Sequence, residues 1–330
     1  MRDVALRAPV RAAALGMYVP ECVVTNEDLS KIVETSDEWI VQRTGIRTRR
    51  RVAENEYASD LAVNAVRDLL AQHPDVDPRS IDYVIVSSTT PDYVYPSIAA
   101  LVQDRIGIPT SSGALDVSAA CAGFCAGLNL GAALIASDQA RSVLLVAAEA
   151  LTRSVDYTDR STCVLFGDGA AAMLIVRDER SALAGMDSGS DGSAGPALYR
   201  TAMRREIAGI RDESGLLRQV GRDVYRWVLE NIPPAIDRIL DRAGMSLDEI
   251  DWFIPHSANM RMIEALCKRI GFPLERTLTS MVEYGNTSAV SIPLALIPAV
   301  RNGTIKSGDR ILVVGFGGGL VSAGAVLTWI

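Results

Sequence analysis

The chain has 330 residues, of which 48% are hydrophobic and 22% charged, and its formal net charge at pH 7 is -7. This balance is typical of a globular enzyme and excludes a disordered or fibrous chain; the length suffices for two core-bearing units or one large duplicated unit. An acidic surface repels the phosphate backbone of nucleic acids, so we expect no nucleic-acid partner, and any anionic partner must meet a local basic patch.

The start of the chain and one internal segment bear on membrane targeting. Residues 1–11 carry three arginines and no apolar run, so we expect no signal peptide or membrane anchor and predict a cytoplasmic protein. Residues 119–136 contain no charged residue and are just long enough to suggest a membrane-spanning helix. They are rich in Gly and Ala, include Asn129 and lie between strand-like segments, so we interpret them as a buried helix and expect no membrane contact.

Helical and strand-like patterns alternate along the chain, which is typical of an α/β fold with buried sheets. Residues 60–70 have the apolar spacing of a helix, with Asp60 near its start. Residues 185–195 are rich in Gly, Ser and Asp and predict a surface connection between two halves. Short apolar runs predict central strands at residues 83–88, 142–147 and 310–315.

The two halves resemble each other in sequence. Residues 81–85 (Ile-Asp-Tyr-Val-Ile) are echoed by residues 250–254 (Ile-Asp-Trp-Phe-Ile). In each half a further strand is predicted sixty residues after the start of this segment, at Arg141 and at Arg310. A single echo arises by chance in α/β proteins, whereas two matched strand pairs at equal spacing favour an internal duplication.

Cys121 is the candidate nucleophile among five cysteines, whose odd number and scattered spacing do not predict structural disulfides. It lies where a predicted strand leads into the long apolar helix. The free backbone N–H groups and the dipole of a helix start favour a thiolate, so we predict a pKa below the usual value of about 8.5. No His or further Cys lies near in sequence to complete a zinc site with Cys125, so we predict no metal. Small inert core residues are the simplest interpretation of Cys22, Cys125, Cys163 and Cys267.

The chain contains two histidines, so imidazole chemistry has few candidates. His73 lies in a Gln-His-Pro-Asp segment after an amphipathic helix, and we interpret it as a solvated loop residue. His256 follows the apolar residues 252–255, at the end of a predicted buried strand, where the sites of α/β sheets collect. Alone it would be read as a structural histidine. Because Cys121 occupies a matching place in the first half, His256 becomes a catalytic candidate.

Two further motifs carry compatible chemistry. Asn286 presents an amide in a Gly-Asn-Thr-Ser turn before an apolar helix, and residues 315–319 (Gly-Phe-Gly-Gly-Gly) follow a predicted strand. The glycine run does not fit a dinucleotide fingerprint, because an apolar strand at residues 320–330 follows it instead of a helix. Its exposed backbone N–H groups would instead suit an oxyanion.

These motifs, in this order, resemble the signature segments of the beta-ketoacyl-acyl carrier protein synthase III family. The resemblance extends over nearly the whole chain. The segments that carry it are residues 116–124, 255–259, 285–288 and 315–319, together with residues 35–46, 159–160 and 166–169.

The resemblance implies a fold and a division of the chain. The family's fold is α/β, a duplicated, thiolase-like five-layer α-β-α-β-α sandwich, and its members are usually homodimers. The implied N-terminal half, residues 1–178, holds the nucleophilic Cys, and the C-terminal half, residues 206–330, holds the His and Asn. Residues 179–205 are expected to be a connecting loop region.

The resemblance also implies a mechanism, a decarboxylative Claisen condensation that initiates fatty acid or polyketide synthesis. Cys121 would attack a short acyl-CoA and form an acyl-enzyme, while the N–H groups of Cys121 and Gly318 bind the oxyanion. Malonyl-acyl carrier protein would then lose carbon dioxide, and His256 and Asn286 would donate hydrogen bonds to the enolate oxygen. Acyl-CoA is a substrate in this scheme, so no cofactor is expected.

Substrate contacts follow from the resemblance as well. Trp39 and Arg160 match the family pair that sandwiches the adenine of CoA, and Tyr95 matches an aromatic that reaches the acyl pocket of the neighbouring subunit. Basic residues on two predicted helices would steer the acidic carrier protein. The implied substrate contacts are Trp39, Arg43, Thr44, Arg160, Asn259 and Tyr95, and the implied docking residues are Arg222, Arg226, Arg261, Lys268 and Arg269.

Departures from the family pattern and rival readings limit what the sequence decides. Ser257 stands where the family usually has Gln, and residues 321–323 where a Thr-Trp-Gly run is common, so the primer is not predicted. A thiolase would need a second catalytic Cys at Gly315, and a hydroxymethylglutaryl-CoA synthase a Glu near Thr89. Two alternatives stay open: a secondary-metabolism relative that joins two acyl chains or transfers an acyl group to oxygen or nitrogen, and a non-catalytic acyl-CoA-binding protein.

Overall fold

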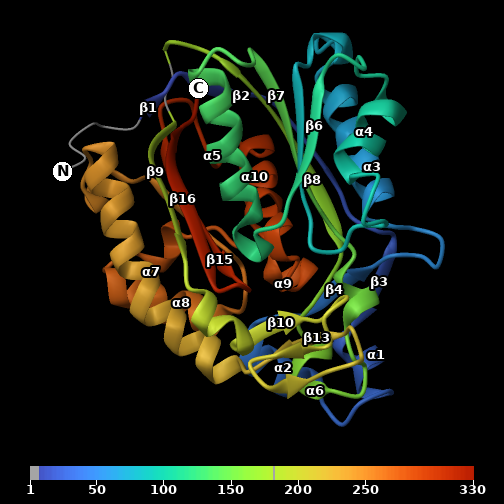
Figure 1. The fold of residues 1–330 in the computed structure, drawn as a ribbon. Coiled ribbons are helices and arrows are strands. Elements are labelled where there is room, and N and C mark those ends of the chain that lie inside the picture. Colours follow the sequence, from blue (N-terminus) through green and yellow to red (C-terminus); the bar gives the residue numbers. More distant parts are fainter. Residues whose placement is uncertain (1–6, 181–182) are drawn as a thin grey trace.

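Two five-stranded sheets organise the computed structural model, which describes residues 7–180 and 183–330 (Figure 1). The first sheet has the order β2 (Val10–Tyr18), β8 (Gly169–Arg177), β7 (Ser142–Glu149), β5 (Tyr83–Ser87) and β6 (Gly113–Val117). Strand β5 is parallel to β7 and β6, while β8 is antiparallel to β7 and β2. Strand β7 is buried along its whole length, as expected where both faces of a sheet are covered.

The second sheet repeats this arrangement with one parallel pair of strands. Its order is β1 (Arg7–Ala8), β9 (Leu183–Ser190), β16 (Val321–Thr328), β15 (Arg310–Gly317) and β14 (Trp252–Pro255). Strand β14 is parallel to β15, and the other neighbours are antiparallel. The apolar run after the glycines is therefore a strand, as predicted.

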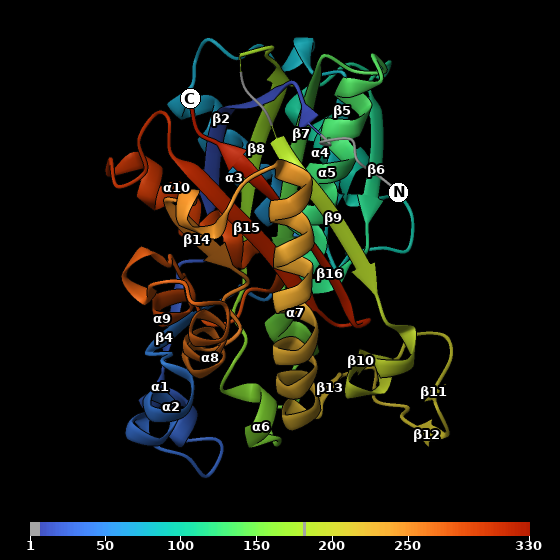
Figure 2. The same cartoon turned by 90° about the vertical axis from the view of Figure 1, so that its left-hand side faces the viewer.

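Helices form three layers, one between the sheets and one outside each of them (Figures 1 and 2). The duplicated five-layer α-β-α-β-α sandwich implied by the family resemblance is confirmed. The middle layer holds α5 (Gly123–Ala136) and α10 (Ser291–Arg301), the first sheet is covered by α3 (Ala58–Gln72) and α4 (Ile98–Ile106), and the second by α7 (Gly221–Ala243) and α8 (Met260–Ile270).

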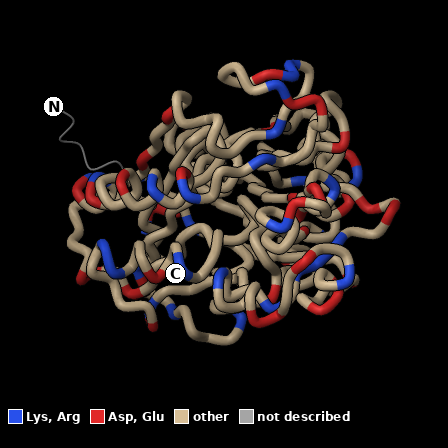
Figure 3. The backbone as a smooth tube through the Cα atoms, turned by 90° about the horizontal axis from the view of Figure 1, so that it is seen from below, with Lys and Arg blue, Asp and Glu red and all other residues tan. Residues whose placement is uncertain are grey.

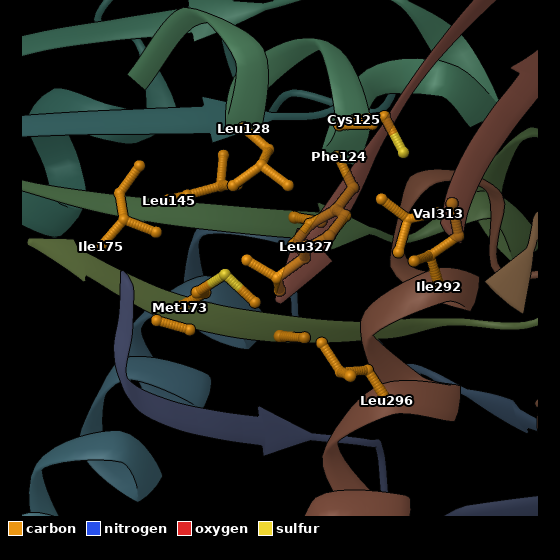
Figure 4. Close-up of a cluster of buried hydrophobic side chains, with 14 of the residues drawn as sticks. Phe124, Cys125, Leu128, Leu145, Met173, Ile175, Ile292, Leu296, Val313 and Leu327 are labelled. Carbon is orange, nitrogen blue, oxygen red and sulfur yellow. The ribbon is translucent and has the colours of Figure 1, made fainter. Parts of the chain in front are cut away.

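Apolar side chains fill the space around the middle layer (Figure 4). Phe124 and Leu128 of α5 are buried together with Met173 of β8 and Leu327 of β16, one strand from each sheet. The charge-free segment 119–136 is thus mainly a buried helix, as predicted. No helix in the described part of the chain is long and apolar enough to span a membrane.

The predicted internal duplication is visible in the hydrogen bonds of the two sheets. In the first half, the Asp82 carboxylate accepts a hydrogen bond from the Arg141 backbone N–H at 2.7 Å. In the second half, the Asp251 carboxylate accepts the equivalent bond from the Arg310 N–H at 2.8 Å. The repeated Ile-Asp segment therefore places an aspartate just before one strand of each parallel pair, where its carboxylate binds the backbone at the start of the neighbouring strand.

The connecting region predicted at residues 179–205 is partly wrong, because β9 runs through it as an inner strand of the second sheet. One of the glycines that suggested a loop, Gly185, serves close packing here. Gly185 has φ +66°, and a Cβ at this position would lie 2.1 Å from the carbonyl oxygen of Ile239, so only glycine lets α7 pack this closely on β9. Residues 1–6, within the segment considered for a signal peptide, lie outside the described part of the chain.

Short elements lie mainly around the lower end of the sandwich in Figure 1. The strands are β3 (Cys22–Thr25), β4 (Thr48–Arg51), β10 (Leu198–Arg200), β11 (Glu206–Ile207), β12 (Ile210–Arg211) and β13 (Leu217–Gln219), and the helices are α1 (Asn26–Ser30), α2 (Asp37–Thr44), α6 (Arg160–Cys163) and α9 (Met281–Tyr284). The 3-10 turns are η1 (Pro78–Ser80), η2 (Ala120–Ala122), η3 (Leu151–Ser154), η4 (Gly192–Ala197), η5 (Leu247–Glu249), η6 (Leu274–Arg276) and η7 (Ser288–Val290).

Candidate active site

Cys121 lies in the turn η2, directly before α5, and lines a cavity of about 660 Å³. The strand end that carries the glycine run approaches it closely. A Cβ on Gly317 would lie 2.8 Å from the Cys121 Sγ, so the absence of a side chain at this position makes room for the sulfur. The glycine run thus forms one wall around the thiol.

The surroundings of the Cys121 sulfur favour a thiol over a thiolate. Burial raises its pKa to about 12, and the charge of Glu149 adds to this effect. Hydrogen bonds from the Ser288 side chain and from the backbone of Gly318 and Cys121 oppose the rise without cancelling it. The predicted lowering of the pKa is therefore wrong, because the loss of water around the sulfur outweighs the helix start. The two backbone groups predicted to bind the oxyanion do face the sulfur.

His256 continues β14 by one residue and also lines the cavity. Its backbone N–H donates to the Val314 carbonyl at 2.9 Å, and its ring packs edge-on against the Phe316 ring with centroids 5.5 Å apart. The side chain is buried, which lowers its pKa to about 3, so the imidazole is neutral at physiological pH. A neutral ring carries a single N–H and can act as a hydrogen-bond donor through it.

Asn286 follows α9 and reaches the same cavity from a third part of the chain. Its backbone N–H donates to the Leu165 carbonyl at 2.8 Å, which anchors the turn to the first half. Its side-chain Oδ1 accepts the Ser288 backbone N–H at 2.9 Å. Because the oxygen is engaged, the amide group has its NH₂ hydrogens left to donate.

The cavity therefore brings together Cys121, His256 and Asn286, as the sequence predicted, and Gly318 lies in its wall. Asn259 also lines it, but its side chain accepts the Met262 N–H at 2.9 Å and caps the start of α8. The assigned roles of these residues stay predictions.

Trp39, Arg43 and Arg160, expected around the adenine of CoA, lie together at the molecular surface. The guanidinium carbons of Arg43 and Arg160 each lie 4.8 Å from the centroid of the half-buried Trp39 ring. Arg160 also donates to the Glu34 carbonyl at 2.9 Å. None of the three lines the cavity itself.

Thr44 does not join this group. It is 5% exposed, and its hydroxyl donates to the Ile40 carbonyl at 2.7 Å and accepts the Ile46 N–H at 3.0 Å. The hydroxyl therefore closes the end of α2, and the expectation that Thr44 contacts CoA is not supported.

The five predicted docking residues are all exposed and lie on α7 and α8, which pack side by side (Figure 2). Arg226 pairs with Asp223 at 2.8 Å, and Arg222 lies 4.0 Å from the same carboxylate. Arg261 donates to the Gln42 carbonyl at 3.0 Å and so links α8 to α2. Basic and acidic segments alternate over the molecule seen in Figure 3, so a positive docking surface is local. The remaining docking candidates on α8 are Lys268 and Arg269.

The loop before α4 exposes large apolar side chains. Tyr95 is 86% exposed and does not line the cavity of its own chain, whereas Tyr93 and Val94 do. Val94 is nevertheless 92% exposed. The sequence analysis singled out Tyr95 alone, and the pattern Tyr-Val-Tyr gave no sign that its two neighbours border the cavity.

Three buried residues next to the site escaped the sequence analysis. Glu149, at the end of β7, accepts hydrogen bonds from Thr89 and from the Thr90 hydroxyl, 60 and 59 residues away in sequence. A lone carboxylate after an apolar run was the only signal for it. Ser288 lay inside a recognised motif, but its contact with Asn286 was not foreseen. Ser291 forms a hydrogen bond with His256 and had no sequence signal at all.

Other expectations from the sequence have mixed outcomes. His73 is half-buried, and its Nε2 accepts the Leu15 N–H at 3.4 Å, so it is not the solvated residue that was predicted. All five cysteines are free, as expected. Within residues 7–180 and 183–330, no group of three or more His, Cys, Asp and Glu side chains is placed to hold a metal ion.

Family comparisons agree with this geometry. The family description "3-Oxoacyl-[acyl-carrier-protein (ACP)] synthase III" matches residues 115–192, and its C-terminal counterpart matches residues 240–329. These segments contain Cys121, His256, Asn286 and Gly318.

Similar proteins of this family cover nearly the whole chain. A beta-ketoacyl-[acyl-carrier-protein] synthase III 2 of Halalkalibacterium halodurans is 48% identical over 97% of this chain and 96% of its own length. The solved synthase III of Thermus thermophilus is 43% identical, with a TM-score of 0.93 over 97% of this chain and 99% of that one. The priming beta-ketosynthase of the R1128 polyketide pathway is 35% identical, with a TM-score of 0.90 over 99% and 98%. The chain therefore belongs to the beta-ketoacyl-[acyl-carrier-protein] synthase III family of acyl-transferring condensing enzymes.

Proposed function

We propose that the chain condenses a short acyl-CoA primer with malonyl-acyl carrier protein, in a decarboxylative Claisen reaction that initiates fatty acid or polyketide synthesis. The observation that carries this proposal is the meeting of Cys121, His256 and Asn286 in the wall of one cavity, although they come from three distant parts of the chain. The names of the family's members support the same reaction.

In the first half-reaction the Cys121 sulfur attacks the carbonyl carbon of the acyl-CoA thioester. The bond from that carbon to the CoA sulfur breaks, and the departing CoA thiolate takes up one proton as the Cys121 thiol loses one. The backbone N–H groups of Cys121 and Gly318 stabilise the oxyanion of the tetrahedral intermediate, since both already face the sulfur.

In the second half-reaction malonyl-acyl carrier protein loses carbon dioxide, and the resulting enolate carbon attacks the acyl group on Cys121. The bond between the acyl carbon and the Cys121 sulfur breaks, and the sulfur takes up a proton. His256 and Asn286 stabilise the enolate oxygen as hydrogen-bond donors. Because decarboxylation itself supplies the carbanion, the reaction needs no strong base, metal or other cofactor.

The entrance of the cavity would bind the CoA part of the primer. Trp39, Arg43 and Arg160 offer an aromatic face and two cations for the adenine and the phosphates of CoA, and Asn259 lies nearer the cavity for the pantetheine. An aromatic ring already flanked by two guanidinium groups must exchange one of them for the adenine. We expect local rearrangement of these arginines on binding.

The acidic carrier protein would dock on the exposed basic side chains of α7 and α8 beside the same entrance, where opposite charge steers association. They are Arg222, Arg226, Arg261, Lys268 and Arg269.

A second copy of the chain would complete the acyl pocket. Tyr95 and Val94 are almost fully exposed on the loop before α4, and exposed apolar side chains of this size favour burial in an interface. In the proposed homodimer Tyr95 reaches the cavity of the partner. We place the protein in the cytoplasm, since its cysteines are free.

The deciding experiment presents the protein with a panel of short acyl-CoAs and with malonyl-acyl carrier protein, and follows protein mass, carbon dioxide and product mass. We expect one acyl group per chain, and then carbon dioxide and a β-ketoacyl-carrier protein in equal amounts. Acylation followed by transfer to an alcohol, an amine or a second acyl chain would favour a secondary-metabolism relative instead. Binding of acyl-CoA without acylation would contradict an enzymatic role.

A further inference from the structure

His256 is held by a contact that decides which of its two ring nitrogens carries the hydrogen. Its Nδ1 lies 2.8 Å from the hydroxyl oxygen of Ser291, the first residue of α10. Ser291 is fully buried and does not line the cavity, so this hydroxyl does not contact a substrate there. Its relevant partner is the back of the imidazole ring.

The proton of this contact can be assigned by accounting for donors. The Ser257 backbone N–H donates to the Ser291 Oγ at 3.2 Å, and this bond uses a lone pair of the oxygen. The single hydroxyl hydrogen of Ser291 then needs an acceptor. Among the hydrogen bonds of the described residues, the His256 Nδ1 is the acceptor available to it. Nδ1 therefore accepts, and a neutral ring must carry its hydrogen on Nε2.

The neighbouring amide is fixed by the same principle. Ser288 donates its backbone N–H to the Oδ1 of Asn286 at 2.9 Å, which leaves the amide hydrogens free. The Ser288 N–H occupies the oxygen of Asn286, and the Ser291 hydroxyl occupies Nδ1 of His256. The Asn286 NH₂ group and the His256 Nε2–H are thus the groups left to donate. Ser288 and Ser291 come from η7 and from the start of α10, which follow each other in the chain.

We propose that Ser291 is a positioning residue that fixes His256 in the Nε2–H tautomer, so that the imidazole donates a hydrogen bond and does not accept a proton at Nε2. The tautomer is a property of the folded protein, and its catalytic consequence rests on the proposed function, in which His256 donates to the enolate oxygen. An imidazole in the opposite tautomer would present a lone pair to that oxygen and destabilise the enolate.

The tautomer can be read directly because the chain has two histidines. Protein labelled with ¹⁵N in the histidine rings gives two imidazole spin systems, and His73→Gln identifies the one that belongs to His256. In the unsubstituted protein we expect a protonated Nε2 and an unprotonated Nδ1. Ser291→Ala should let the Nδ1–H form appear, and Ser291→Thr, which keeps a hydroxyl, should restore the Nε2–H form. Should the threonine not be accommodated, Ser291→Cys keeps a weak donor of similar size.

A matched control comes from the same buried cluster. Ser280 donates its hydroxyl to the Ser291 carbonyl at 2.8 Å and does not contact the imidazole. Ser280→Ala also removes one buried hydroxyl group from this cluster, and we expect it to leave the tautomer of His256 unchanged. An Nδ1–H ring in the unsubstituted protein, or an unmixed Nε2–H ring in folded Ser291→Ala, would overturn the inference.

Kinetics test the consequence separately. Ser291→Ala should slow carbon dioxide release from malonyl-carrier protein roughly tenfold to a hundredfold, less than removal of the donor itself, while acylation of Cys121 continues. Ser291→Thr should recover most of the rate. A changed tautomer with unchanged decarboxylation would contradict the proposed role of His256 and leave the structural assignment standing, so the two failures are distinguishable.

Discussion

The candidate catalytic centre and the proposed entrance of its cavity, formed by Trp39, Arg43 and Arg160, are built on opposite principles. Cys121, His256 and Asn286 are at most 7% exposed, and His256 and Asn286 are anchored through backbone hydrogen bonds to other elements. At the entrance, Arg43 and Arg160 are exposed and held mainly by contacts with one half-buried aromatic ring.

This difference in burial decides how strongly a single hydrogen bond or charge affects the reaction. In the buried centre, water does not screen charges and dipoles, so a single donor or a single misplaced atom has a large effect on rate. At the exposed entrance, solvent and salt weaken each contact, and only the sum of several residues matters. We therefore expect changes in the centre to abolish steps, and changes at the entrance to shift affinities.

The largest effect is expected for Cys121→Ala, which removes the nucleophile. Self-acylation from acyl-CoA should be abolished, while slow decarboxylation of malonyl-carrier protein persists because His256 and Asn286 are still in place. Cys125→Ala, one helical turn further on and also fully buried, is the matched control and should acylate normally. Intact-protein mass and peptide mapping test this, and a label on Cys125 or Cys163 would refute the assignment.

His256→Ala and Asn286→Ala should separate the two half-reactions. Each removes one donor to the enolate oxygen, which typically costs on the order of a hundredfold or more in rate. Acylation should continue, because a histidine whose pKa is lowered to about 3 is a poor base for the thiol. Rapid-quench acylation and carbon dioxide release are measured on folded variants. Loss of acylation in His256→Ala would make the imidazole the base of Cys121.

Gly317→Ala tests how tightly the centre is fitted. The new Cβ would lie 2.7 Å from the Cys121 Cβ and 2.8 Å from its Sγ, so the thiol must move. We expect acylation to slow by about a hundredfold, because small displacements of reacting atoms are costly. In Gly318→Ala the nearest atoms lie 3.4 Å from the new Cβ, and this variant should acylate far better. Equal rates in both would contradict a tight fit around the sulfur.

Glu149→Gln should change how stability depends on pH. Burial raises the pKa of Glu149 from 4.5 to about 7, so the folded protein binds this proton more tightly than the unfolded chain does. The stabilisation is therefore complete below pH 4.5 and is lost as the pH rises through 7. This loss is on the order of 3 kcal/mol, and Gln, which does not titrate, should abolish it. Urea unfolding at about pH 5 and about pH 8 measures the difference, and an unchanged pH dependence would rule out the shift.

The smallest effect is expected at the entrance. Lys268→Glu with Arg269→Glu should weaken use of malonyl-carrier protein roughly threefold to tenfold at low salt, and the difference should shrink as salt is added. Acylation from acyl-CoA should be unaffected. The double variant avoids Arg261, whose bond to Gln42 links two helices. Arg79→Glu, at an exposed position in η1, controls for a charge reversal elsewhere on the surface and makes half of the change in net charge. Equal loss of both half-reactions would argue against a docking role.

Much of the fold followed from local patterns in the sequence. The apolar runs at Tyr83, Ser142 and Arg310 became buried strands, and the charge-free segment after residue 119 became the central helix. The prediction failed at β9, where Gly185 looked like a loop residue. Its glycine is required by the approach of α7, a helix that follows about thirty residues later, and no local pattern carries such information.

The candidate site was likewise predicted in part from local patterns. Motifs placed Cys121, His256 and Asn286 at ends of elements, and those ends do meet. The sequence failed on the electrostatics of Cys121, because a helix start is a local feature whereas burial depends on everything packed around the sulfur. Thr44 failed similarly, since its hydroxyl is consumed by the helix end next to it.

The sequence by itself determined several central strands, the duplication and the candidate catalytic side chains, because these depend on residue type and on spacing along the chain. Tertiary structure alone decided how those side chains behave. The neutral state of His256, the protonated thiol of Cys121 and the raised pKa of Glu149 all arise from the exclusion of water by distant segments. Ser288 and Ser291, in a turn and at the following helix start, orient Asn286 and His256. The contact between Ser291 and His256 joins residues 35 apart in the chain and forms only on folding.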